Sequence, residues 1–166
     1  MRRDWQRIVG YAATYFAATT ATILWTRHSG GLALFWPGTA IAAALFLTLP
    51  YRRWAMPFGI LVVLSTIATS VFGFGPKVAL PLALVNIGEG LLTAFLLQKF
   101  RPQGDYVTSG SGILILIGVA GVAVPITVSP FGGFIAWEAV GGTWLMHVMA
   151  WIVGHGLGAM LVMPLV

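Results

Sequence analysis

The chain of 166 residues contains no cysteine. Disulfide bonds, a catalytic thiol and a thiolate metal site are therefore excluded. Charge is also scarce, because only 8% of the residues are Asp, Glu, Lys or Arg, whereas a soluble domain has about 25%. Since 58% of the residues are hydrophobic, the composition argues against a water-soluble domain and indicates an integral membrane protein.

Motifs for catalysis are missing as well. The sequence has no glycine-rich loop that would cradle a phosphate, no His pair at i, i+4 with a Glu, and no Ser-His-Asp arrangement with a water-facing site. We therefore expect no catalysis within this chain. The net charge of +5 could suggest nucleic acid as a partner, but the basic residues separate apolar runs, so we assign them to membrane orientation.

Long apolar runs make up most of the chain, and each is long enough to cross a hydrocarbon core of ~30 Å as a helix. Runs this continuous favour helices over barrel strands. The sequence thus predicts one all-α membrane domain over 1–166, with an interfacial turn or short re-entrant segment at 129–142. Its six predicted transmembrane helices cover about 8–26, 32–49, 55–72, 78–97, 111–128 and 143–165.

The basic residues predict the orientation of these spans. Seven of the nine precede the first span or lie in alternate connections after it, and the other two lie on the opposite side. Because cytoplasmic connections carry the excess of Lys and Arg, both termini are predicted to be cytoplasmic. The seven are Arg2, Arg3, Arg7, Arg52, Arg53, Lys99 and Arg101, and the two are Arg27 and Lys77.

Several residues have a structural interpretation. Pro37 falls in the outer turns of the second predicted span, where proline costs little. Gly154 and Gly158 have the GxxxG spacing that lets another helix approach closely. Tryptophans near predicted helix ends are typical of an interfacial belt, and these are Trp25, Trp36, Trp54, Trp137 and Trp144.

Two ionisable residues lie deep inside predicted spans, where such groups are costly and face the bundle interior. Glu89 is about eleven residues from the outer end of the fourth span and His155 about twelve from that of the sixth, so both reach a similar depth at ~1.5 Å per residue. Asn86 lies one turn from Glu89 on a similar face. We predict a polar cluster of Asn86, Glu89 and His155, which either holds helices together or responds to a ligand or proton.

Imidazoles inside a membrane also raise b-type haem as a cofactor. His147 and His155 are eight residues apart, about 12 Å along one helix, and therefore cannot bind opposite faces of one porphyrin. His147 and His28 are predicted to lie on the same side and could pair. The alternative is that each histidine only makes hydrogen bonds.

Three stretches resemble a known family, MASE1, the first of the membrane-associated sensor domains. FWPGTAIAAAL (35–45), with the basic-aromatic turn RRW (52–54), resembles one of its helices. NIGEGLLTAFLLQK (86–99) and WIVGHGLG (151–158) resemble two more. The likeness covers about residues 30–166. His155 stands where the family usually has aspartate, and many members have about eight or more spans rather than six.

The resemblance implies a sensory input domain in the inner membrane of a bacterium. It implies a homodimer whose last helix continues into a cytosolic diguanylate cyclase or histidine kinase after residue 166, so the chain is interpreted as an excised or compact module. Trp151 joins Asn86, Glu89 and His155 as a candidate signal-binding residue. The alternatives are a small membrane transporter or substrate-capture component, and a passive anchor that dimerises an enzyme.

Overall fold

A computed structural model describes residues 2–26 and 33–165, and this part of the chain contains only helices and their connections. Two short 3₁₀ helices, η1 (Tyr51–Arg53) and η3 (Met163–Leu165), complete the set. The other elements are α1 (Arg2–Thr26), α2 (Gly38–Leu47), α3 (Ala55–Phe72), α4 (Pro76–Phe100), α5 (Gly110–Leu116), η2 (Ile117–Ala123), α6 (Val124–Val140) and α7 (Trp144–Val162).

Five helical segments of the described chain are long and apolar enough to cross a membrane. They confirm the all-α class and the multi-pass membrane character, but the second predicted span, 32–49, is wrong in length. The α2 helix has only 10 residues, about half of what a crossing needs. Residues 33–37, which we call the strap, lead into it without helical structure, and Pro37 is its N-cap rather than part of the helix. The physical reason is that a residue before proline, here Trp36, avoids helical geometry.

The connection predicted at 129–142 is also wrong. α5, η2 and α6 follow one another without a break as a helical segment of 31 residues, Gly110–Val140, so the predicted span 111–128 continues to Val140. The turn into α7 is confined to Gly141 and Gly142, whose φ angles of 75° and 85° suit glycine. The glycines that suggested a turn, Gly132 and Gly133, instead allow close packing: a Cβ on Gly133 would lie 2.7 Å from Val148 Cγ2.

The middle of this long segment, η2, is a π-helix of seven residues. It ends just before Pro125, which lies at the start of α6 and has no backbone N–H to donate. The wider π turns accommodate that gap in the hydrogen-bond ladder. η2 packs against α7, where a Cβ on Gly156 would lie 2.5 Å from the Gly121 carbonyl oxygen.

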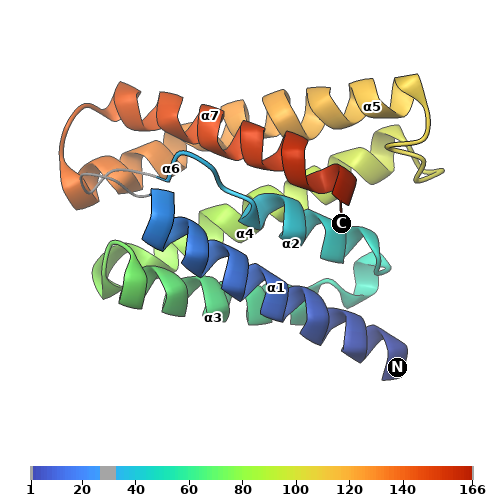
Figure 1. The fold of residues 1–166 in the computed structure, drawn as a ribbon, viewed down its shortest axis with the longest axis horizontal. Coiled ribbons are helices and arrows are strands. Elements are labelled where there is room, and N and C mark those ends of the chain that lie inside the picture. Colours follow the sequence, from blue (N-terminus) through green and yellow to red (C-terminus); the bar gives the residue numbers. More distant parts are fainter. Residues whose placement is uncertain (1, 27–32, 166) are drawn as a thin grey trace.

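The helices form a bundle in which α2 and α4 lie between α1 and α3 on one side and α6 and α7 on the other (Figure 1). Both ends of the chain lie at the same end of the bundle, together with η1 and the α4–α5 connection (Figure 1). The α3–α4 and α6–α7 connections lie at the opposite end. The chain therefore presents two distinct ends.

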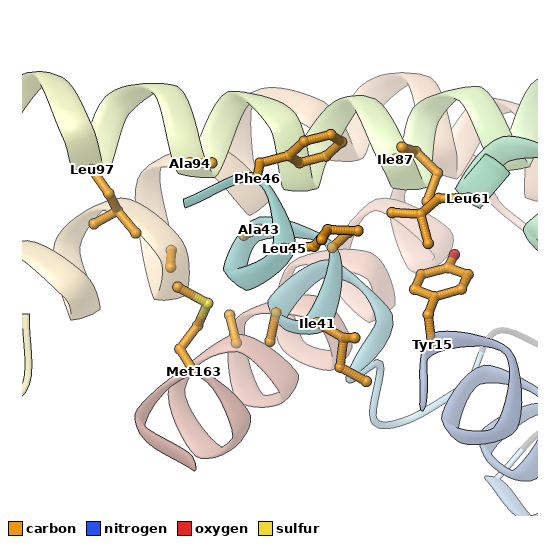
Figure 2. Packing of buried hydrophobic residues seen from close by; sticks show 14 of the residues in the cluster. Tyr15, Ile41, Ala43, Leu45, Phe46, Leu61, Ile87, Ala94, Leu97 and Met163 are labelled. Carbon is orange, nitrogen blue, oxygen red and sulfur yellow. The ribbon is translucent and has the colours of Figure 1, made fainter. Parts of the chain in front are cut away.

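The core surrounds α2, whose residues from Gly38 to Phe46 are all buried. A helix that is apolar on every face is expected to be enclosed by others, and α2 contacts α1, α4 and α7. Figure 2 shows Leu45 and Phe46 packing among side chains of neighbouring helices. This position brings α2 into contact with helices on both sides of the bundle.

Ion pairs lie at the end of the bundle that holds the chain ends. Arg53 of η1 pairs with Asp4 of α1. After α4, the guanidinium of Arg101 binds both carboxylate oxygens of Asp105, at 2.6 and 2.5 Å, and the Ser109 hydroxyl at 2.7 Å. Ser109 in turn caps α5. The hydrogen bonds from Arg101 lower the pKa of the Asp105 carboxyl below its ordinary value, which keeps this turn paired near neutral pH.

Candidate functional site

Glu89 is the centre of a buried polar cluster. Its side chain, on α4, is 0% exposed, and its Oε2 lies 2.7 Å from His155 Nδ1 and 3.0 Å from Trp151 Nε1. Both partners belong to α7, so the carboxylate joins the two helices by two hydrogen bonds. The depth argument from the sequence thus brings together the right pair, Glu89 and His155.

Two indole rings and a hydroxyl surround the His155 imidazole. The ring stacks on Trp151, with centroids 4.1 Å apart and planes at 21°, and on Trp36 of the strap, at 5.8 Å and 17°. The Thr39 hydroxyl of α2 lies 3.3 Å from Nδ1. Nδ1 thus lies within hydrogen-bond distance of both Glu89 and Thr39. The imidazole therefore links α2, α4, α7 and the strap.

Several polar atoms near this pair have no hydrogen-bond partner within the described part of the chain. They are Glu89 Oε1, Asn86 Oδ1 and Trp36 Nε1, and all three residues are buried. An unpaired buried polar atom costs about 1–3 kcal/mol. Asn86, Trp36 and His155 line one cavity, of about 40 Å³ for water-sized molecules. The cluster is thus polar, incompletely satisfied and next to open space.

The face of α7 that carries Gly154 and Gly158 packs against the strap, not against another helix as the spacing suggested. A Cβ on Gly154 would lie 2.8 Å from the Ala33 carbonyl oxygen, and one on Gly158 would overlap the Trp36 carbonyl oxygen. The Trp36 amide also donates to the Gly154 carbonyl at 3.0 Å. The glycines thus bring a non-helical backbone, with the Trp36 ring attached, to the His155 side chain.

The other two histidines do not join this cluster. His147 is 1% exposed, and its Nε2 lies 2.7 Å from the Gly141 carbonyl oxygen. Because a carbonyl only accepts, Nε2 carries the proton, and the contact closes the turn between α6 and α7. His28 lies outside the described residues, so its pairing with His147 stays a prediction.

The described residues do not fit b-type haem, which needs a free imidazole nitrogen and a flat space for the porphyrin. Nε2 of His147 is engaged by the Gly141 carbonyl oxygen, and the faces of the His155 ring are stacked on the indoles of Trp151 and Trp36, which leaves no flat space beside the ring. The adjacent cavity of about 40 Å³ has room for only about three waters. The described part of the chain also has no group of three His, Asp or Glu side chains that could hold a metal ion.

The comparison with protein families agrees with the resemblance seen in the sequence. The MASE1 family model matches residues 5–166. The chain belongs to the MASE1 family. MASE1 domains are non-catalytic membrane sensor domains of bacterial signalling proteins. No curated protein and no solved structure matches the chain significantly.

Two residues of the buried cluster around His155 were missed by sequence reasoning. Trp36 was assigned to an interfacial belt, but it is only 7% exposed and stacks on His155. Thr39, which contacts His155 Nδ1, was not singled out. The sequence signal that could have found both is their place on either side of Pro37, because a residue before proline avoids helical geometry. The helix therefore starts only after Pro37, with Trp36 in the strap and Thr39 in the first turn of α2.

Proposed function

We propose that this MASE1 chain receives a signal at the Glu89–His155 contact and transmits it through α7. The observation that carries the proposal is the buried hydrogen bond of 2.7 Å between the two side chains. Removing one partner of a buried ion pair or charged hydrogen bond typically costs about 3–5 kcal/mol. A stimulus that strengthens or weakens this contact can therefore shift how α7 packs on α4.

The glycine contacts of α7 couple such a shift to the strap and to η2. The strap rests on Gly154 and Gly158, and η2 rests on Gly156. Contacts this close leave little room for gradual adjustment, so we propose that α7 has two discrete packings. An effective stimulus must interact differently with the two packings, since binding both equally shifts nothing.

The proposal includes an orientation and an output. Both chain ends are cytoplasmic by the distribution of basic residues, and the end of the bundle that holds them also holds the two ion pairs described above. By resemblance to other MASE1 proteins, the chain lies in the inner membrane of a bacterium. Its α7 helix then leads to a cytosolic diguanylate cyclase or histidine kinase. Those outputs act as dimers, so a homodimer is part of the proposal.

The test compares His155→Gln and Glu89→Gln in the full-length protein with its output domain. Both variants keep hydrogen-bonding groups while removing the charge or the imidazole. We expect the basal output, or the response to growth conditions, to change at least about fivefold, the lower range of allosteric coupling. The matched control is His147→Gln, which alters a buried histidine on the same helix whose ring bonds the Gly141 carbonyl of the adjacent turn. Wild-type output and response in both site variants would refute the proposal.

A further inference from the structure

A second cavity, of about 560 Å³, opens at the end of the bundle that holds both chain ends. Its walls come from α1, α2, η1, α4, the α4–α5 connection, α5 and η3. Three of the four tyrosines of the chain line it, Tyr11, Tyr51 and Tyr106, and we call it the tyrosine cavity. Pockets that bind small organic ligands have volumes of about 300–1,000 Å³. The tyrosine cavity is therefore large enough for a ligand and not only for water.

The lining of the tyrosine cavity has a polar part and an apolar part. Besides the phenols, it contains the side chain of Gln98, which is partly exposed and makes no hydrogen bond within the described part of the chain. Leu47, Val107 and Leu116 supply apolar surface, and Val107 is 47% exposed. Tyrosines are typical of the level where a membrane meets water, because their rings have an apolar body and a polar tip. The lining therefore suits an amphipathic ligand at this level.

The hydroxyl of Tyr106 remains a hydrogen-bond donor near neutral pH. Its pKa is raised above the ordinary value, first by partial burial and then by the nearby Tyr51 and Asp105. The influence of Tyr51 shows that the two phenols lie near each other in the wall of the cavity. A protonated phenol donates a hydrogen bond to an oxygen such as that of a phosphate. This wall therefore offers neutral donors for an acceptor-rich group.

Charge at this end of the bundle favours an anion. Seven of the nine basic residues lie here, at the start of α1, in η1 and around the end of α4, against two acidic residues, Asp4 and Asp105. The excess is five positive charges, and no acidic residue occurs among the described residues that line the cavity. Positive charge close to a membrane surface attracts anionic lipid headgroups. The surroundings of the cavity thus attract an anion, and its lining provides hydrogen bonds.

We propose that the tyrosine cavity binds the phosphate headgroup of an anionic phospholipid whose acyl chains remain in the bilayer. The apolar part of the lining favours a lipid over a free phosphate ion, which has no apolar surface. Met163 and Pro164 of η3 also line the cavity, so a bound headgroup touches the segment that directly follows α7. This inference goes beyond the proposed function, because it concerns a second site, far along α7 from His155.

The test uses the intact chain with ¹³C-labelled tyrosine in phosphatidylcholine nanodiscs, in which phosphatidylglycerol replaces an increasing fraction of the lipid. We expect the NMR signals of the Tyr11, Tyr51 and Tyr106 rings to shift and to saturate. Tyr15 is the internal control, because it is 0% exposed and does not line the cavity, so its signal should stay in place. Shifts that grow without saturation would reflect only the changed membrane surface and would overturn the inference.

Two variants with the same change of charge separate the cavity from the surface around it. Gln98→Glu places a negative charge in the lining, so the half-saturating fraction of phosphatidylglycerol should rise about fivefold, the effect of one charge near a membrane. Gln6→Glu is the matched control, because Gln6 is exposed on α1 at the same end and does not line the cavity. Since water and salt screen an exposed charge, its effect should stay below about twofold. Equal effects of the two variants would contradict a headgroup in the cavity.

Inorganic phosphate distinguishes a lipid from a soluble ion. Added to nanodiscs of phosphatidylcholine alone, it is expected to leave the tyrosine signals in place. Saturation of the same three signals by phosphate would show a site for a soluble phosphate compound and would overturn the lipid proposal. The output test on His155→Gln is independent, because the tyrosine signals report binding at η3 whether or not that variant alters the output.

Discussion

The two buried histidines of α7 differ in what they contact, and this difference separates a signalling role from a structural one. His155 meets the Glu89 carboxylate, the Thr39 hydroxyl and the Trp36 indole from other parts of the bundle, and the Trp151 indole one turn away on α7. His147 meets a backbone carbonyl six residues away. A change at His155 therefore acts on the packing between helices, whereas a change at His147 acts on one turn.

The His147 contact leads to a stability prediction. In His147→Ala the Gly141 carbonyl loses its donor and a buried side chain becomes a cavity, so we expect the free energy of unfolding to fall by about 1–3 kcal/mol. The measurement is unfolding of the purified chain in mixed detergent micelles. His147→Gln, which keeps a side-chain N–H donor, should recover part of the loss. Equal stability of the alanine variant and the wild-type chain would show that the contact contributes nothing.

At the residue scale, the sequence was sufficient for the Glu89–His155 pair because both lie deep in apolar helices that run in the same direction, and unpaired charges there are costly. It was insufficient for Trp36 and Thr39. Their roles depend on the strap crossing α7, and the sequence pattern of the strap does not predict that contact. The unsatisfied atoms of Asn86 and Glu89 are likewise visible only once neighbouring side chains have positions.

At the scale of the elements, predictions succeeded where an apolar run ended in strong signals. The predicted span 55–72 coincides with α3 (Ala55–Phe72), which follows a basic turn and ends before glycine-rich sequence. The predictions failed where a glycine or a proline fits either of two local structures, a turn or a close helix contact. Gly132 and Gly133 read as a turn, but they provide space for α7, and a Cβ on Gly132 would overlap the Trp151 ring.

The contact between the strap and α7 gives a prediction at this scale. In Gly158→Ala the new methyl group would collide with the Trp36 carbonyl oxygen, so the strap must move away from His155. We expect a loss of about 1–3 kcal/mol in the free energy of unfolding, as for other overpacked sites. We also expect the ¹⁵N–¹H NMR signal of the Trp36 indole to shift.

Gly88→Ala is the matched control for this substitution. Gly88 lies inside α4, and a Cβ there meets nothing within 4 Å, so the higher helix propensity of alanine should leave stability unchanged or raise it by up to about 1 kcal/mol. If Gly158→Ala is as stable as Gly88→Ala and leaves the Trp36 signal in place, the strap does not depend on this close approach.

At the scale of the whole molecule, the number of helical segments determines where the two chain ends lie. Five long segments and the short α2 make six passes along the bundle, so both chain ends arrive at one end (Figure 1). Six apolar runs in the sequence predicted this parity even though one run proved too short to cross a membrane alone. A short central helix is tolerable because its neighbours bury α2 from Gly38 to Phe46, so this helix does not have to span the lipid by itself.

The absence of cysteine allows the proposed orientation to be tested with single introduced thiols. Gln103, in the α4–α5 connection, and Lys77, at the start of α4, are both exposed and lie at opposite ends of the bundle. If the chain ends are cytoplasmic, a membrane-impermeant maleimide should label Lys77→Cys but not Gln103→Cys in spheroplasts, and both after permeabilisation. Gln103→Cys leaves the charge distribution unchanged, and Lys77→Cys removes a basic residue from the outer side, so neither change favours inversion. Labelling of Gln103→Cys alone would reverse the orientation and place the tyrosine cavity in the outer leaflet.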